Sequence, residues 1–272
     1  MIENFNIYVK PVPCTNNMEN FILYNASQST CSQRVRYALH AKKITFEDKK
    51  LDLFSGDQLA PEYLKINPNG VVPALVHQGQ SITDSVVILE YLEDIFPEVF
   101  PMRPKKPEIV ARVRAMMRFV DEVPGPAIRI PSYNLAFLPH YQSMTEDEFQ
   151  SLCDSKPLRR EFLMKMGRTG FSEADMNESL TRLKRGIERM AEWLDYSKGP
   201  WLTGDQFTIA DLAIMPVIVR MADINLGYMW DKLPVIEGWL SRIQSSENYN
   251  ATFYHGSLLT EKYPHLANMK KI

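Results

Sequence analysis

Three hydroxyl side chains and one thiol occupy four consecutive positions, Ser29, Thr30, Cys31 and Ser32. They follow a short apolar run at 21–24 and precede Val35, Ala38 and Leu39, which share one face of a helix, so we expect them at the start of that helix. The unpaired N–H groups and partial positive charge of a helix N-terminus stabilise a thiolate. Ser29 and Ser32 have the spacing of a redox CxxC motif with both cysteines replaced, and a serine hydroxyl can donate to a sulfur anion carried by a ligand. Alternatively, one of these serines only caps the helix.

Cys31 has two interpretations of its own. It is either a nucleophile activated at the helix start or, as is commoner for a lone cysteine, a small buried apolar residue. The three cysteines of the chain are widely spaced, and its five histidines show no metal-ligand spacing. We therefore expect no metal site, no structural disulfide and a cytoplasmic location.

Two further segments carry groups that suit a peptide-like ligand. Val72 precedes Pro73 where a turn enters a predicted strand, and a cis peptide bond there would present the backbone N–H and C=O of Val72 to an extended peptide. A plain turn is the alternative. Asp84 and Ser85 stand at the start of a predicted helix, and in one interpretation they only cap it. In the other, the free N–H groups of the helix start bind the carboxylate of an amino acid and Asp84 binds its ammonium, as a γ-glutamyl group would require.

The elements that must position these residues fall into two halves. Residues 20–96 predict the order βαβαββα, an α/β domain with a small mixed sheet flanked by helices. The second strand is expected at 45–53, and Gln78 and Gly79 predict a hairpin turn between the last two strands. The segment 97–108 contains four prolines and indicates a linker. Residues 109–272 favour an all-helical domain, with an insert and a C-terminal tail. Residues 1–19 form a predicted N-terminal extension.

Within the helical half, apolar spacing predicts four helices, near 109–120, 180–194, 209–221 and 236–243. Pro216 should kink the third of them. Thr208 and Asp211 have the spacing of a capping box, a structural role at the start of that helix. Residues 125–176 give no clear pattern apart from a short helix near 145–153.

Composition excludes several classes of function. The net charge is −2 and Lys and Arg are not in excess, which argues against a nucleic-acid partner. No run of about 18 apolar residues is present, and the N-terminus lacks the pattern of a signal peptide, so no membrane association is expected.

Four motifs, in this order, together resemble those of the glutathione transferases: STCSQRV, NPNGVVPALV, TDSVVILEYLE and FTIADLAIMP. The resemblance runs from about residue 20 to 245. It implies a thioredoxin-like N-terminal domain, an all-helical second domain and glutathione as cosubstrate. It also implies a cytosolic homodimer, or a heterodimer with a related chain, with the active site at the domain and subunit interface.

The resemblance assigns roles to the hydroxyl and thiol cluster and to one polar residue beyond it. Ser29 matches the catalytic Ser or Cys of several classes, with Thr30 beside it, and other classes rely on the positions of Cys31 or Ser32. Gln58 matches a polar residue that contacts the glycyl end of glutathione.

The remaining glutathione contacts match the two peptide-binding segments. Val72, before the cis-proline at Pro73, matches the residue whose backbone pairs with the cysteinyl part. Asp84 and Ser85 match the pair that holds the γ-glutamyl end. Many members have Lys where Val71 stands, so one carboxylate contact is missing or replaced.

The stretch from 118 to 183 resembles the long insert of bacterial β-etherases, glutathione transferases that cleave β-aryl ethers of lignin-derived phenolics. That resemblance implies a hydrophobic aromatic substrate. The active-site loop differs, since Thr30, Cys31 and Ser32 stand where the best-known β-etherase has Ala-Asn-Ser. A Cys31-dependent glutathione lyase or thiol transferase is one alternative. A glutathione-binding partner subunit with little activity is another.

Selectivity for that substrate must come mostly from the helical half. Aromatic residues of the insert and of the tail either line its pocket or pack these segments onto the helices: Tyr133, Phe137, Tyr141, Phe253, Tyr254 and Tyr263. We also expect an arginine of the first predicted helix of that half to approach the ketone or phenolate oxygen: Arg112, Arg114 or Arg118.

Overall fold

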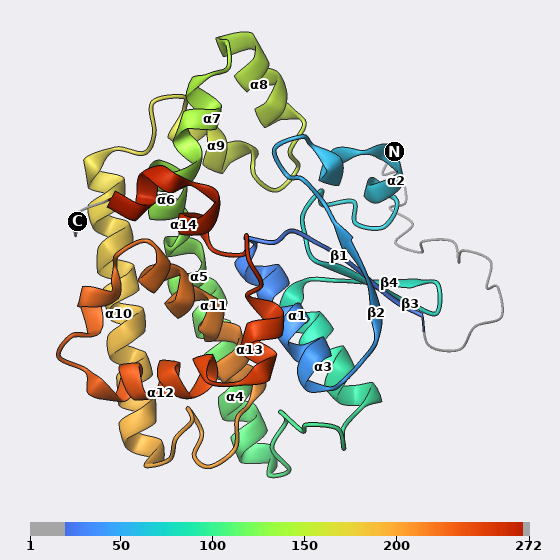
Figure 1. Cartoon of the computed structure of the whole chain (residues 1–272), viewed down its shortest axis with the longest axis vertical. Coiled ribbons are helices and arrows are strands. Elements are labelled where there is room, and N and C mark those ends of the chain that lie inside the picture. The colour runs from blue at the N-terminus through green and yellow to red at the C-terminus, as the bar shows by residue number, and fades with distance from the viewer. Residues whose placement is uncertain (1–19, 269–272) are drawn as a thin grey trace, which may run out of the picture.

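The computed structural model describes residues 20–268, so the predicted extension at 1–19 lies outside the described residues. Its first lobe is a four-stranded sheet in the order β2-β1-β3-β4 (Figure 1). Strand β2 is parallel to β1, whereas β3 and β4 are antiparallel additions. The strands are β1 (Phe21–Asn25), β2 (Phe46–Lys50), β3 (Ala74–His77) and β4 (Gln80–Thr83).

The helices of this lobe follow the predicted order, which confirms the thioredoxin-like βαβαββα arrangement. Helix α1 (Thr30–Ala41) makes the crossover between the parallel strands and buries the expected face of Val35, Ala38 and Leu39. The others are the 3₁₀ turn η1 (Asp57–Leu59), α2 (Pro61–Leu64) and α3 (Ser85–Ile95). Strand β2 is shorter than expected, and its charged sequence FEDKK suits an edge position.

Strand register brings distant segments together at one end of the sheet. Ala74 pairs with both Tyr24 and Thr83. The residues just beyond these pairs are the loop that leads into α1, the Val72–Pro73 turn and Asp84. Three predicted ligand-binding segments therefore meet at this sheet end.

The second lobe is helical, and α11 (Ile209–Asp223) is its core, buried from Ile209 to Met221 and continuous through Pro216. Asp211 is fully buried and accepts hydrogen bonds from the backbone N–H and the hydroxyl of Thr208, both at 2.9 Å, and from Trp239 Nε1 at 2.9 Å. This geometry supports the structural role of the pair. Further predicted helices are confirmed as α4 (Pro107–Glu122), α10 (Glu173–Ser197) and α12 (Pro234–Gln244).

The unassigned segment between α4 and α10 forms short helices, of which α7, α8 and α9 project above the sheet lobe (Figure 1). Thr145 and Glu148 form a capping box at the start of α8, which confirms the predicted short helix. The projection has its own small core, around Phe149, Cys153 and Leu163. The elements of the whole segment are α5 (Pro124–Ala127), α6 (Arg129–Ser132), the π turn η2 (Tyr133–Phe137), α7 (Leu138–Gln142), α8 (Glu146–Asp154) and α9 (Arg160–Met166).

The tail packs against α1 and α11. The Arg36 side chain donates to the carbonyl of Thr252 at 3.3 Å, and Gln33 Nε2 donates to the carbonyl of Ser257 at 3.2 Å. Its elements are α13 (Glu247–Thr252), α14 (Leu259–Lys262) and the 3₁₀ turn η4 (Pro264–Asn268). A further 3₁₀ turn, η3 (Gly227–Trp230), lies between α11 and α12. Among residues 20–268, no helix combines the length and apolarity needed to cross a bilayer.

Candidate functional site

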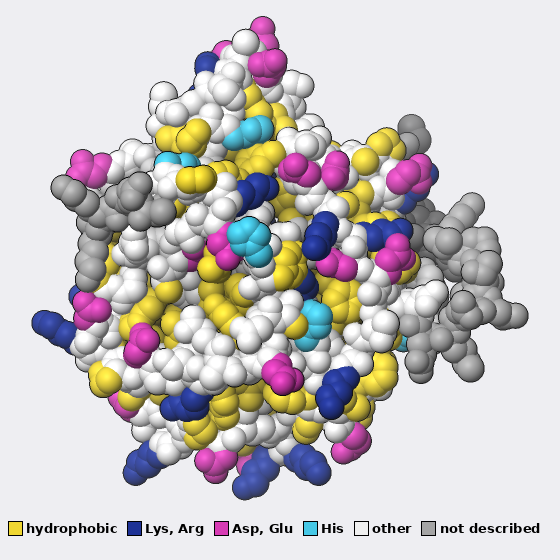
Figure 2. Space-filling model, in the orientation of Figure 1, with side chains coloured by type: hydrophobic (Ala, Val, Ile, Leu, Met, Phe, Trp, Pro, Cys, Tyr) yellow, Lys and Arg dark blue, Asp and Glu magenta, His cyan; other side chains and the backbone are white. Residues whose placement is uncertain are grey.

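A cavity of about 440 Å³ lies between the two lobes. The sheet lobe contributes residues 26–31, 50–54, 57–58 and 70–72, and the helical lobe contributes its short helices, α11 and the tail. On this face, hydrophobic and basic side chains lie next to one another below the α7–α9 projection (Figure 2). The cavity therefore joins the predicted ligand-binding loops to the insert.

Ser29 is the N-cap of α1, and its Oγ accepts the Ser32 N–H at 3.2 Å. Capping uses a lone pair of the hydroxyl and leaves its O–H able to donate toward the cavity that Ser29 lines. Thr30 and Cys31, the first two residues of α1, line the same cavity. The cap and the ligand donor are thus compatible roles of one serine.

Ser32 lies elsewhere. It is fully buried, it does not line the cavity, and its Oγ accepts the Ala26 N–H at 3.3 Å. Ser32 therefore stabilises the loop before α1 through this hydrogen bond. Of the four clustered residues, only Ser29, Thr30 and Cys31 reach the cavity.

The Val72–Pro73 peptide bond is cis, as predicted, and Val72 lines the cavity. The carbonyl of Val71 accepts the Tyr63 hydroxyl at 2.6 Å and Asn67 Nδ2 at 2.7 Å. These two bonds fix the turn that presents the Val72 backbone. Burial raises the pKa of the Tyr63 hydroxyl, which keeps it a donor.

Gln58 is almost completely buried in the cavity wall. Its Nε2 donates to the carbonyl of Leu53 at 3.3 Å, whereas its Oε1 has no hydrogen-bond partner within the described chain. An unpaired buried acceptor costs about 1–3 kcal/mol. A ligand N–H placed against Gln58 would remove that cost.

Asp84 is exposed and caps α3, accepting the N–H groups of Val86 at 2.8 Å and Val87 at 3.2 Å. Ser85 is buried, and its Oγ accepts Arg34 Nη1 at 3.1 Å. Neither Asp84 nor Ser85 lines the cavity; the strand register places both near the Val72–Pro73 turn. A ligand that reaches from Gln58 past Val72 to Asp84 must be extended, as a tripeptide is.

Replacing Asp84 with Asn is expected to weaken glutathione binding by about 1–3 kcal/mol, because the charge that pairs with the γ-glutamyl ammonium is lost. Asn caps helices as well as Asp does, so the melting temperature of the ligand-free protein should hardly change. Calorimetric titration with glutathione and a thermal melt check both parts. A large drop in melting temperature with unchanged affinity would make Asp84 a helix cap and nothing more.

The aromatic residues of the insert and of the tail have different positions. Tyr133, Phe137 and Tyr141 line the cavity, as the pocket hypothesis requires. The tail rings do not. Tyr254 donates to or accepts from Ser27 Oγ at 2.9 Å, and the Tyr263 ring packs 5.7 Å from the Phe137 ring. Some of the six rings therefore line the cavity, as expected, and the tail rings follow the alternative interpretation, because they pack against its surroundings.

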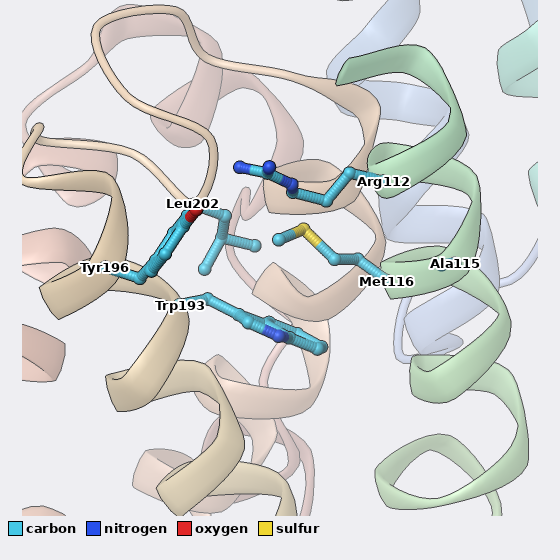
Figure 3. A pocket seen from close by; sticks show the side chains of 6 residues that line it. All are labelled: Arg112, Ala115, Met116, Trp193, Tyr196 and Leu202. Atoms are coloured by element: carbon cyan, nitrogen blue, oxygen red, sulfur yellow. The ribbon is translucent and has the colours of Figure 1, made fainter. Parts of the chain in front are cut away.

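The expectation that an α4 arginine approaches the substrate oxygen is wrong, because none of the three lines the main cavity. Arg114 pairs with Glu90 at 3.0 Å, and Arg118 pairs with Glu122. Arg112 lies 5.2 Å from the centre of the Tyr196 ring and lines a separate cavity of about 300 Å³ between α4 and α10 (Figure 3). The α4 arginines face away from the site because α4 turns its apolar side to α11.

The basic residues that do line the main cavity were missed by the sequence interpretation. From the helical lobe they are Arg129, Lys156, Arg159, Arg220 and Lys262. One signal was available: Arg129, Tyr133, Phe137 and Tyr141 follow one another at intervals of four, the spacing of one helical face. Pro131 and Pro139 argue against a continuous helix in the sequence, and in the structure this face runs through α6, the π turn η2 and α7.

Arg220 is buried among polar partners. Its guanidinium donates to the carbonyl of Gln28 and to Ser132 Oγ at 3.4 Å, and it lies 3.9 Å from Asp223. Desolvation lowers its pKa to about 10, so it stays charged at neutral pH. Arg220 thereby ties α11 to the loop that presents Ser29.

Comparison with known proteins decides the family. Residues 28–95 match the glutathione S-transferase N-terminal domain and residues 150–247 match the C-terminal domain. Glutathione S-transferase 1 of Dianthus caryophyllus is 34% identical over 197 residues, 72% of this chain and 75% of the relative. The chain belongs to the glutathione S-transferase family.

Two relatives bear on what this transferase acts on. Protein LigF of Sphingobium sp. strain SYK-6 is 30% identical over 230 residues, 82% of this chain and 89% of the relative. The crystal structure of beta-etherase LigF superposes with a TM-score of 0.79 at 27% identity, covering 86% of this chain and 98% of that one. A probable maleylacetoacetate isomerase of Caenorhabditis elegans is 32% identical over 205 residues, 75% of this chain and 80% of the relative.

The family uses glutathione as cosubstrate. Glutathione transferase URE2P6 of Phanerochaete chrysosporium, solved with oxidised glutathione, has the same fold, with a TM-score of 0.66 at 19% identity over 86% of this chain and 94% of that one. In this transferase Gln58, with its unpaired Oε1, and Val72 line the cavity, and the exposed Asp84 carboxylate lies near the Val72–Pro73 turn. They offer polar groups along the length of an extended tripeptide.

Proposed function

We propose that this transferase cleaves the β-aryl ether bond of a lignin-derived aromatic ketone. The observation that carries the proposal is the likeness to beta-etherase LigF over 86% of this chain. The lining of the cavity supports it, because the start of α1 and three aromatic rings of the insert border one space. Aromatic walls suit a diaryl substrate through offset and edge-to-face contacts.

The reaction needs a thiolate, an electrophilic carbon and a leaving group. Glutathione supplies the thiolate, which attacks the carbon that carries the aryloxy group beside the ketone. A carbon–sulfur bond forms, the carbon–oxygen bond breaks, and the phenolate leaves and takes up the proton released by the thiol. The Ser29 hydroxyl and the first N–H groups of α1 stabilise the sulfur anion, and the rings of Tyr133, Phe137 and Tyr141 hold the aryl groups.

The test is an assay of the purified homogeneous chain with a β-aryl ether ketone and glutathione, following phenol release. We expect release that depends on glutathione. A generic aryl halide serves as the second substrate, because it reports transferase activity without ether cleavage. Turnover of the halide alone would refute ether cleavage, and turnover of neither would favour a partner subunit with little activity. Dimerisation of the chain, with itself or with a related chain, stays a prediction that sedimentation can check.

A second candidate function is isomerisation, favoured by the 32% identity to a probable maleylacetoacetate isomerase. Glutathione-dependent isomerisation of maleylacetoacetate, measured on the same preparation, separates it from ether cleavage. A third is a thiol enzyme based on Cys31, which lines the cavity and is partly exposed. Rapid labelling of Cys31 by iodoacetamide at pH 6 would favour that enzyme.

A further inference from the structure

Three basic side chains form an unpaired group on the helical wall of the cavity: Arg129, Lys156 and Arg159. Within residues 20–268, none of the three lies within 4.0 Å of a carboxylate oxygen. Arg159 donates only to the carbonyl of its neighbour Leu158, at 3.3 Å, and no bond from the side chain of Arg129 or Lys156 is found within that range. This basic group differs from Arg220, whose guanidinium has three partners.

The unpaired arrangement is unfavourable without a ligand. Burial lowers the pKa of Arg129 and of Lys156, and the charge of Arg159 lowers the pKa of Arg129 further. Partly desolvated like charges repel one another, and an anion placed among them would offset both costs. This arrangement of the basic group therefore favours the binding of an anion in the cavity.

The rest of the cavity sets the chemistry and orientation of that anion. Tyr133 and Tyr141 lie next to the basic group with ring centres 6.0 Å apart and planes 15° from parallel. The sheet-lobe side of the cavity carries two carboxylates, Asp52 and Asp57, and one cation, Lys50, which pairs with Asp48 at 3.7 Å. An aryl ring therefore fits against the tyrosines, with its charged substituent directed to the helical wall. Arginine side chains match the planar carboxylate with paired N–H donors.

We infer that the second substrate carries a carboxylate on its aryl group, and that Arg129, Lys156 and Arg159 bind it. The inference rests on the proposed ether cleavage and names the class of ether: a carboxylated aryl ether ketone. The γ-glutamyl carboxylate of glutathione has a separate candidate site, at the start of α3. The basic group thus determines specificity and takes no part in bond breaking.

The experiment compares two phenacyl aryl ethers that differ only by a para-carboxylate on the aryloxy ring. For the unmodified transferase we expect a higher kcat/KM with the carboxylated ether. Arg129→Gln and Lys156→Gln should each reduce the ratio of the two kcat/KM values by about tenfold, the scale of one charge-assisted bond. Arg160→Gln is the matched control, because Arg160 is paired with Asp154 at 2.8 Å outside the cavity, and it should leave the ratio unchanged.

Other outcomes would overturn the inference. Equal loss with both ethers would make Arg129 structural, and a rise in the KM for glutathione alone would assign it to a glutathione carboxylate. Arg129→Lys retains the charge and should restore part of the ratio if the glutamine variant folds poorly. If neither ether is cleaved, ether cleavage fails but the inference is still tested, by calorimetric titration of the glutathione-loaded protein with both ethers. Equal affinities for the two would then refute it.

Discussion

Ser29→Ala is expected to lower glutathione-dependent turnover at pH 7 by about tenfold or more. Lowering a thiol pKa by about two units takes roughly 2.7 kcal/mol, at about 1.36 kcal/mol per unit. One charge-assisted hydrogen bond contributes about 1.5–3 kcal/mol, so a single hydroxyl with the helix N-terminus is sufficient. Ser29 can supply that bond because capping α1 uses only its lone pair.

Two control variants separate catalysis from capping. Ser29→Ala also removes a cap, which costs about 1 kcal/mol of stability, whereas glycine at an N-cap costs only a few tenths. Ser29→Gly should therefore lose as much turnover as Ser29→Ala at a higher melting temperature. Cys31→Ser should retain most of the turnover. If Cys31→Ser abolishes turnover and Ser29→Ala does not, the thiol carries the chemistry.

Lys42→Met is expected to lower the free energy of unfolding by about 3–5 kcal/mol, the cost of breaking a buried ion pair from one side. Lys42 Nζ lies 2.7 Å from Glu93 Oε1, with the two side chains 0% and 1% exposed. Lys42 also donates to the carbonyls of Phe96 and Val99, and Glu93 accepts the N–H of Met102. The pair thus holds the segment between the lobes against α1 and α3.

Urea denaturation measures this effect. The double variant Lys42→Met with Glu93→Leu should recover much of the loss, because no unpaired charge then remains buried. Lys65, paired with Glu62 at 2.9 Å on the surface, is the matched control, and Lys65→Met should cost less than about 1 kcal/mol. A loss as small as that for Lys42→Met would mean that water reaches the pair.

The helices and strands that were predicted correctly were predicted from local sequence patterns. Apolar spacing predicted α1 from Val35, Ala38 and Leu39, because the residues on the buried face of a helix recur every three or four positions. The turn at Gln78 and Gly79 predicted the β3–β4 hairpin for the same local reason. Apart from α8, the short helices between α4 and α10 escaped prediction because prolines interrupt their spacing and tertiary packing holds them.

The sequence by itself determined the family motifs, the helix starts and the hydroxyl and thiol cluster, since each depends on residues close together in the chain. Tertiary structure decided which members of the cluster face a ligand. Ser29 and Ser32 are the same residue type three positions apart, yet one lines the cavity and the other is buried beneath it. It also decided which arginines border the cavity: Arg129 does, whereas Arg112 lies on a different surface. Orientation toward a shared space depends on how the lobes pack, and contacts between residues about 100 positions apart leave no periodic signal in the chain.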